Sequence, residues 1–226
     1  MILIVPASKT ARRTPVSLDR FTEQVRSADD LASIIGTPSA LAVKKELPSL
    51  DEHMRRFIAC SPFVVMSTHS ADGRCDASPR GDAPGFVHVV DERTLLIPDR
   101  RGNKRVDSFR NILETGSIGL LFLVPGFGET LRINGRAAII RDEAWLTPLA
   151  VQGRRPLLAI AVEVQECFLQ CAKALLRSKL WEPHQTPDLQ GLPCAAQMFA
   201  DHVQMPEYDV AAMQTLLDES YRNNLY

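Results

Sequence analysis

Residues 94–122, TLLIPDRRGNKRVDSFRNILETGSIGLLF, are the most informative part of this chain. Their pattern predicts a strand, a Gly102-Asn103 turn, a helix that opens with Lys104 and Arg105, and a second strand. The apolar positions of the helix recur at three- and four-residue spacings, which places them on one face: Val106, Phe109, Ile112 and Leu113. The segment therefore inserts one amphipathic helix between two strands.

The two cations at the start of this predicted helix indicate an anion. A helix N-terminus carries partial positive charge from its unpaired N–H groups, so Lys104 and Arg105 would cost energy there without an anion between them. A bound phosphate would satisfy both, with Asn103 as the N-cap and Gly102 allowing close approach of the backbone. The alternative is a solvated turn whose cations face water. This segment alone leaves both interpretations open.

Length and composition are those of an ordinary globular protein. The 226 residues are 45% hydrophobic and 23% charged, and they fit one domain of about 200 residues with terminal appendages. The net charge of −1 gives no reason to expect nucleic acid or an anionic membrane as a partner. The longest apolar runs, 118–125 and 157–162, are far shorter than the roughly 20 residues that cross a bilayer.

The sequence predicts a cytoplasmic location. Residues 1–6 are apolar, but Lys9, Arg12 and Arg13 follow them, which reverses the basic-then-apolar order of a secretory signal. The cysteines are odd in number and widely spread, which suits free thiols in a reducing compartment: Cys60, Cys75, Cys167, Cys171 and Cys194.

The chain divides into three predicted parts. Residues 1–60 form a helical lead-in, 61–168 a strand-rich barrel, and 169–226 a helical extension that completes the site. Strands follow one another with a single inserted helix, which favours a small antiparallel barrel over a doubly wound parallel sheet. The predicted strands are 63–66, 74–78, 85–90, 94–98, 118–124, 131–140 and 157–164, with a hairpin turn at 70–73. The fold class is thus mainly β with added helices (α+β).

A second motif covers residues 78–85, SPRGDAPG, in which two prolines and two glycines predict an irregular turn. Irregular backbone at a barrel rim often holds ligands, and Arg80 is the cation of this turn. The alternative is a rigid corner in which Arg80 pairs with Asp82. An integrin-type Arg-Gly-Asp function is discounted because nothing indicates secretion.

A third motif covers residues 167–183, CFLQCAKALLRSKLWEP. Its Trp181 either stacks on a planar ring or completes a hydrophobic corner. A zinc site formed by Cys167, Cys171, His184 and Cys194 is rejected, because one C-x3-C without a second ligand pair is a weak metal signal. The sequence also lacks the glycine-rich nucleotide loops, the serine-hydrolase elbow and the zincin motif.

Several motifs in order resemble the pyridoxamine 5′-phosphate oxidase-like flavoproteins. They are SPRGDAPGF (78–86), LIPDRRGNKRVDSFRNI (96–112), LLFLVPG (120–126) and ETLRINGRA (129–137). The element CAKALLRSKLW (171–181) is similar to that of a bacterial subgroup distinct from the true oxidases. The resemblance covers residues 25–190 or so.

This resemblance implies a split β-barrel homodimer that binds FMN non-covalently at the subunit interface. The positions that would hold the FMN phosphate are Arg80, Asn103, Lys104 and Arg105. Ser78 would lie near the flavin ring or ribityl chain. Arg132 and Asn134 are candidate contacts from the same or the partner subunit. The site would be closed from the C-terminal side by Arg177, Ser178 and Trp181.

The implied function is that of an FMN-dependent oxidoreductase acting on an unidentified small molecule. A reduced nicotinamide is a candidate electron donor, and a small organic molecule or oxygen a candidate acceptor; no catalytic acid or base is identified. The Trp-Gly-Gly-Tyr-Arg type strand that grips the substrate of true pyridoxamine phosphate oxidases does not occur here, which argues against vitamin B6 oxidation. Two alternatives are a non-catalytic flavin-binding or sensing dimer, and a split-barrel haem binder. The candidate axial ligands of a haem are His69, His88 and His184.

Overall fold

The computed structural model describes residues 18–182 and 188–226. The chain falls into two compact units, Met1–Val43 and Lys44–Tyr226. The predicted three-part division at residues 60 and 168 stays a prediction.

The first unit contains short helices. They are η1 (Leu18–Arg20) and α1 (Ala28–Ile35), while α2 (Ala40–Lys44) crosses into the second unit. Ser27 is the N-cap of α1, because its Oγ accepts a hydrogen bond of 3.0 Å from the main-chain N–H of Asp30.

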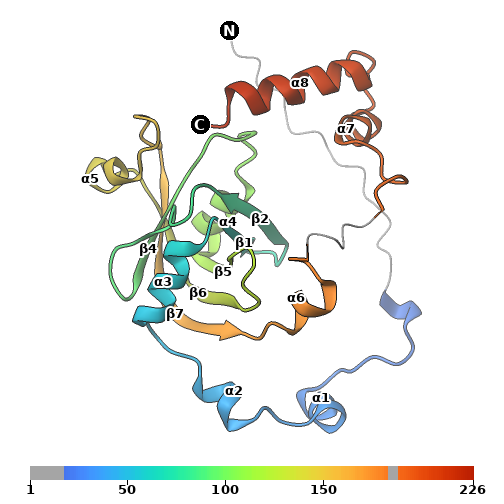
Figure 1. The fold of residues 1–226 in the computed structure, drawn as a ribbon. Coiled ribbons are helices and arrows are strands. Elements are labelled where there is room, and N and C mark those ends of the chain that lie inside the picture. Colours follow the sequence, from blue (N-terminus) through green and yellow to red (C-terminus); the bar gives the residue numbers. More distant parts are fainter. Residues whose placement is uncertain (1–17, 183–187) are drawn as a thin grey trace. The chain divides into compact units, whose positions relative to one another are not determined.

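The second unit is built on one sheet of seven strands, ordered β2-β1-β5-β6-β7-β4-β3 (Figure 1). All neighbouring strands are antiparallel. The strands are β1 (Phe63–His69), β2 (Cys75–Gly81), β3 (His88–Val89), β4 (Thr94–Pro98), β5 (Ser117–Leu123), β6 (Thr130–Ile140) and β7 (Ala159–Gln170). The predicted α+β class, an antiparallel split β-barrel of six to seven strands with flanking helices, is confirmed.

Short helices flank this sheet. They are α3 (Glu52–Cys60), α4 (Asp107–Thr115), α5 (Glu143–Leu146), η2 (Thr147–Leu149), α6 (Lys173–Ser178), α7 (Ala195–Val203) and α8 (Val210–Asn223). The last two pack against each other. Within residues 18–182 and 188–226, every helix is too short or too polar to span a bilayer.

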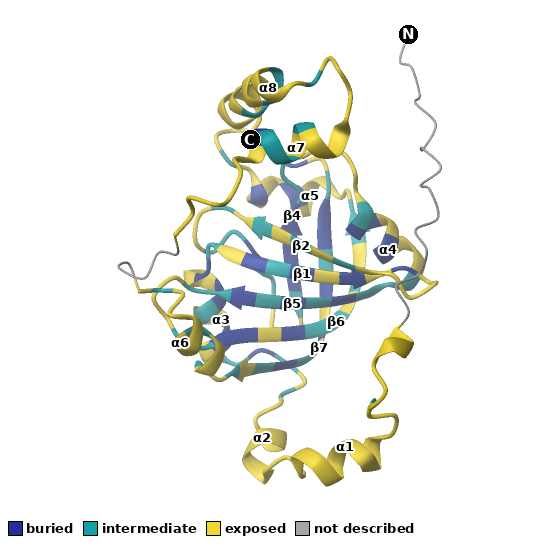
Figure 2. Ribbon diagram, turned by 90° about the vertical axis from the view of Figure 1, so that its right-hand side faces the viewer, coloured by how far each residue is buried: buried dark blue, intermediate teal, exposed yellow. Residues whose placement is uncertain are grey.

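The core lies between the inner faces of the strands and α4. Along β1 and β5, every second position is buried and the positions between are intermediate or exposed, as Figure 2 shows. From α4, Phe109 and Ile112 are buried as predicted, but Val106 and Leu113 are 43% and 76% exposed. The prediction of one four-residue face was wrong: the helix begins only at Asp107, so Val106 precedes it, and Leu113 lies within the helix but outside its buried face.

The β1–β2 hairpin forms with its predicted turn. Gly73 has φ of +84°, and its N–H donates to the carbonyl of Ser70 at 2.9 Å. β2 then runs through Pro79 to Gly81, so the irregular segment predicted from Ser78 begins later. Proline is tolerated in β2 because this strand is the edge of the sheet and needs few of its N–H groups for pairing.

Two other strands differ from prediction in length. β7 extends to Gln170, because it pairs with β6 along its whole length, and Cys167 therefore lies inside the strand rather than after it. The side chain of Cys167 is fully buried, and its Sγ donates to the main-chain oxygens of Leu47 and Ser49 at 3.4 and 3.2 Å. β3 has only two residues, where the pattern predicted six.

A bulge bends the long β6–β7 pair. The register shifts between Asn134 and Gly135, and a Cβ at Gly135 would lie 2.0 Å from the carbonyl oxygen of Glu163. Real side chains never approach a backbone atom so closely, so only glycine fits at this crossing of strands.

Replacing Gly135 by Ala is expected to destabilise the fold by about 2–3 kcal/mol, because β7 must move to admit the methyl group. Urea unfolding monitored by circular dichroism measures the change. Gly191→Ala is the matched control, since a Cβ there meets no atom within 4 Å. A loss below about 0.5 kcal/mol for Gly135→Ala would contradict the close approach.

Candidate functional site

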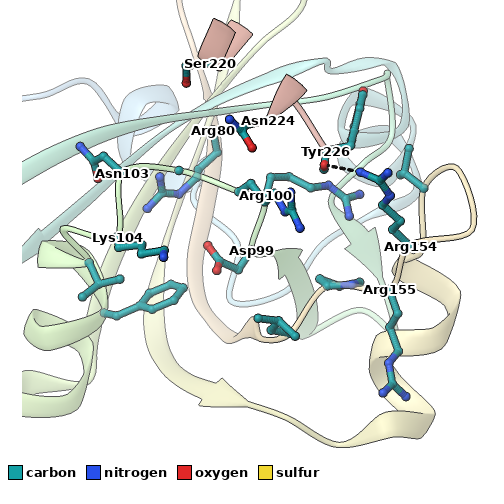
Figure 3. A pocket seen from close by; sticks show the side chains of 17 residues that line it. Arg80, Asp99, Arg100, Asn103, Lys104, Arg154, Arg155, Ser220, Asn224 and Tyr226 are labelled. Carbon is teal, nitrogen blue, oxygen red and sulfur yellow. Dashed lines mark hydrogen bonds between the residues drawn. The ribbon is translucent and has the colours of Figure 1, made fainter. Parts of the chain in front are cut away.

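A cavity of about 1010 Å³ lies where the end of β2, the β4–α4 connection and the segment after α8 meet. Among the described residues that line it, one is acidic, Asp99, and six are cationic: Arg80, Arg100, Arg101, Lys104, Arg154 and Arg155. Figure 3 shows Arg80, Asn103 and Lys104 on one side, which we call the Lys104 end. The opposite side holds Arg154 and Arg155 and is called the Arg154 end. Val151 and Leu157, which also line the cavity, lie close to these two arginines along the chain.

Arg80 reaches the cavity from β2. The strand pairs Arg80 with Val64 of β1, and this register fixes its position. Burial lowers the pKa of its guanidinium, although the nearby carboxylates of Asp99 and Asp76 act in the opposite direction. Burial likewise raises the pKa of Asp99, against the effect of Arg80 and Arg100. A partly desolvated cation facing a partly desolvated acid is a feature of ligand sites more than of solvated corners.

Asn103 and Lys104 also line the cavity, but the helix does not begin with them. α4 starts at Asp107, its N-cap is Val106, and Lys104 and Val106 have φ of +62° and +53°. The Oδ1 of Asn103 accepts from the N–H of Arg105 at 3.0 Å, which makes a local turn. The prediction of Asn103 as N-cap was therefore wrong, because the left-handed backbone of Lys104 and Val106 keeps the helix from starting before Asp107.

Arg105, the fourth predicted phosphate contact, does not line the cavity. Its guanidinium forms an ion pair with Asp107 at the start of α4, and its side chain is 77% exposed. The hydrogen bond that Arg105 donates to Asp107 raises the pKa of Arg105. Of the three consecutive residues predicted to contact the phosphate, Asn103 and Lys104 line the cavity. Arg105 instead pairs with Asp107, which the sequence analysis did not predict.

The other predicted contacts lie outside this cavity in the single chain. The side chain of Arg132 lies 5.5 Å from the ring centre of Phe168. Asn134 donates to Glu166 at 2.8 Å and borders a second cavity of about 320 Å³. Ser78 faces Met66 across the β1–β2 ladder and lines neither cavity.

Two of the predicted C-terminal contacts form hydrogen bonds away from the cavity. The Oγ of Ser178 donates to the carbonyl of Leu175 at 3.1 Å, within α6. The indole Nε1 of Trp181 donates to the carbonyl of Phe127 at 2.9 Å, so this side chain fixes the 125–128 turn. Neither residue lines the large cavity, nor does Arg177.

Asp82 is the residue that the sequence analysis underestimated. Its side chain is 1% exposed, and its Oδ2 lies 2.6 Å from Nε of Arg100, not near Arg80 as the alternative interpretation had it. Its Oδ1 accepts from the hydroxyl of Tyr226 at 2.8 Å. Burial by itself raises the pKa of Asp82, but hydrogen bonds from the Ala83 N–H, Tyr226 and Arg100 outweigh it and hold that pKa below its usual value.

Several lining residues were missed because they belong to distant segments without a recognisable motif. Arg154 and Arg155 follow η2, and Ser220, Asn224 and Tyr226 come from the end of α8 and beyond it. The one sequence feature that could have indicated them is the consecutive pair Arg154-Arg155.

The histidine and cysteine candidates show no common site. Nδ1 of His69 lies 3.1 Å from the carbonyl of Ser70, His88 is exposed on β3, and His184 lies outside the described residues. Burial raises the pKa of the Cys167 thiol to about 11, which keeps it protonated. Across 18–182 and 188–226, no group of three or more His, Cys, Asp or Glu residues could hold a metal ion.

Comparison with known proteins identifies the strand-rich part of the chain. Residues 50–171 match the sequence profile of the family described as pyridoxamine 5′-phosphate oxidase. This span is more than half of the chain and includes Arg80, Asn103 and Lys104. No curated protein matches the sequence significantly.

Three solved structures illustrate the likeness of the fold. HupZ of Group A Streptococcus is 19% identical, with a TM-score of 0.45 over 54% of this chain and 94% of its own. A Lactobacillus delbrueckii protein, named as a candidate pyridoxamine 5′-phosphate oxidase, is 20% identical, with a TM-score of 0.44 over 55% and 98%. An FMN-binding protein of Syntrophomonas wolfei is 11% identical, with a TM-score of 0.39 over 51% and 80%. At these identities and scores, the three say nothing about what this chain binds.

Replacing Asp82 by Asn is expected to lower the free energy of unfolding by about 2–4 kcal/mol at pH 7, because the partly buried Arg100 loses its counter-charge. The folded-state pKa of Asp82 is depressed, so the stability it contributes is present above its unfolded pKa of about 3.9 and is lost as the pH falls through the folded value. The difference between the proteins should therefore shrink below about pH 4.

Urea unfolding at a series of pH values measures this difference. Asp72→Asn is the matched control, because the Asp72–Arg74 pair is 62% and 83% exposed and should contribute far less to stability than the Asp82–Arg100 pair. Equal losses in the two variants would show that Asp82 has no special role.

Proposed function

This chain belongs to the pyridoxamine 5′-phosphate oxidase family, and we propose that it is an FMN-binding oxidoreductase whose large cavity holds the phosphate of the flavin. The observation that carries the proposal is the convergence of Arg80, Asn103 and Lys104 on one cavity. These are three of the four residues that the resemblance assigns to the phosphate, and they come from two separate elements.

The donor set fits a phosphate monoester. A guanidinium, an ammonium and a carboxamide supply the charge and N–H groups that phosphate oxygens accept. The cavity volume of about 1010 Å³ lies at the upper end of the range of roughly 300–1,000 Å³ that small-molecule sites occupy. The support comes from these side chains and no longer from the helix N-terminus, because α4 begins after them.

FMN, when bound, would supply hydride or electron transfer at its ring. The chain's own part would be to bind and orient. Arg80, held in β2, would give the phosphate a fixed direction, and Lys104 would add a mobile second charge. The side chain of Asp99 between the two ends would keep the anion at the Lys104 end.

The proposal includes a homodimer with the site at the interface. Within one chain, the remaining predicted contacts lie away from the cavity: Ser78, Arg132, Asn134, Arg177, Ser178 and Trp181. A second chain would be needed to bring those on β6 and α6 to the flavin ring, and sedimentation equilibrium tests the dimer. The cytoplasmic location and a reduced nicotinamide as electron donor also stay predictions.

The decisive experiment is the absorption spectrum of the purified protein with the mass of the ligand that it releases. A flavin spectrum and the mass of FMN are expected; a Soret band would favour the haem alternative and refute the proposal. Anaerobic mixing with reduced nicotinamides and a panel of small acceptors then separates an oxidoreductase from a non-catalytic flavin-binding or sensing dimer. Bleaching of the flavin followed by recovery on addition of an acceptor is the expected result.

The Arg80→Ala, Lys104→Ala double variant should bind FMN at least about 100-fold more weakly than the wild type, because each charge-assisted hydrogen bond contributes about 1.5–3 kcal/mol. Fluorescence titration of apoprotein with FMN measures the affinity. Arg141→Ala removes one exposed arginine outside the cavity lining and should leave the affinity unchanged. Unaltered FMN binding by the double variant would defeat the phosphate assignment.

A further inference from the structure

The Arg154 end of the cavity is built on a tight turn. Val151 and Arg154 form a β-bridge, with main-chain hydrogen bonds of 3.0 and 2.9 Å in the two directions. The residues between them, Gln152 and Gly153, have φ of +51° and +72°, as a type I′ turn requires. The buried Pro156 anchors the chain two residues later. This backbone holds Arg154 in a defined place in the cavity wall.

The arginines at the Arg154 end and next to it differ in their partners. Arg100 and Arg155 pair with Asp82 and Glu143. Within the described ranges no acidic side chain pairs with Arg154, whose Nη1 donates instead to the main-chain oxygen of Tyr226 at 2.9 Å. That contact uses one of the five N–H donors of the guanidinium, so the others can bind the oxygens of a ligand.

The two cationic ends are separate. Figure 3 shows Asp99 and Arg100 between Lys104 on one side and Arg154 on the other. The carboxyl group of Asp99 would repel an anion placed in the middle, while each end offers positive charge of its own. This distribution suits two anionic groups better than one.

Apolar surface adjoins the Arg154 end. Leu157 is 86% exposed at the wall, and the half-buried Val151 lies on the other side of the turn. An apolar wall beside a few fixed polar groups is the usual composition of a small-molecule site.

We propose that the Arg154 end binds the anionic group of a second small molecule, an organic carboxylate or phosphate ester with an apolar body, which is the substrate of the flavin. The proposal rests on the proposed function, because it takes the Lys104 end to be filled by the FMN phosphate. Arg154 binds the anionic group, and Val151 and Leu157 contact the apolar body.

Isothermal titration calorimetry of the FMN-saturated protein tests this, with phenyl phosphate, benzoate and neutral benzyl alcohol as probes. At least one of the two anions should bind with one equivalent per chain, and at least about tenfold more tightly than benzyl alcohol. Whichever anion binds more tightly distinguishes a phosphate ester from a carboxylate. Arg154→Gln, which keeps a donor for the oxygen of Tyr226, should weaken anion binding at least about tenfold and change FMN affinity less than about twofold.

Three variants serve as controls. Arg154→Lys keeps the charge and should retain most of the affinity, while Arg141→Ala should have no effect. Tyr226→Phe removes the hydrogen bond to Asp82 but keeps Arg154 and the main-chain oxygen that Arg154 contacts, so it measures the contribution of the C-terminal segment, and it should weaken anion binding less than Arg154→Gln does. A loss in Tyr226→Phe as large as that in Arg154→Gln would assign the effect to the C-terminal segment and overturn the proposal.

Other outcomes are equally decisive. The proposal fails if neither anion binds the FMN-saturated protein, or if benzyl alcohol binds as tightly as the anions. It also fails if Arg154→Gln weakens FMN as much as the anion, because a single flavin would then span both ends. If the wild type binds no FMN, the proposed function is refuted, but the Arg154 site is not. Phenyl phosphate binding that is lost in Arg154→Gln and kept in Lys104→Ala would then still support an anion site at Arg154.

Discussion

The buried carboxylate of Asp82 is the group on which the geometry of the cavity depends. It accepts hydrogen bonds from Arg100, just after β4, and from Tyr226, beyond α8. A carboxylate removed from water needs such partners, so the end of β2, the β4–α4 connection and the C-terminal segment are held together at one point. The cavity walls follow from this junction, because Arg80 precedes Asp82 by two residues and Lys104 follows Arg100 by four.

The surplus of positive charge is the second determinant of the site. A protein of net charge −1 gathers six cations around one cavity, and their mutual repulsion must be offset. Asp82 and Glu143 neutralise two of them, and Asp99 lies close to Arg80 and Arg100. The remaining charge makes the cavity favourable for anionic ligands, and cationic side chains on β2 and on the connecting segments carry this effect rather than a helix dipole.

Local patterns predicted well wherever neighbours along the chain decide the structure. The β1–β2 hairpin and the inserted helix followed from spacing and turn chemistry. The start of α4 was predicted too early, because Lys104 and Val106 adopt left-handed backbone conformations. Helix propensities do not predict such conformations, which depend on the surrounding structure. The extension of β7 was missed for the same reason: pairing with β6, and not its own composition, sets its length.

The amino-acid sequence by itself determined the α+β class and the antiparallel hairpins, and together with the family resemblance it predicted Arg80, Asn103, Lys104 and Arg105 as candidate phosphate ligands. The alternation of apolar and polar residues, the glycine turns and the spacing of the cations are properties of single segments, so they can be read without knowing the tertiary structure. Only the tertiary structure placed Arg154 and Tyr226 in the same cavity, since hydrogen bonds across 72 and 144 residues join them to each other and to Asp82. Such contacts depend on where distant segments meet, and no pattern within one segment specifies that meeting.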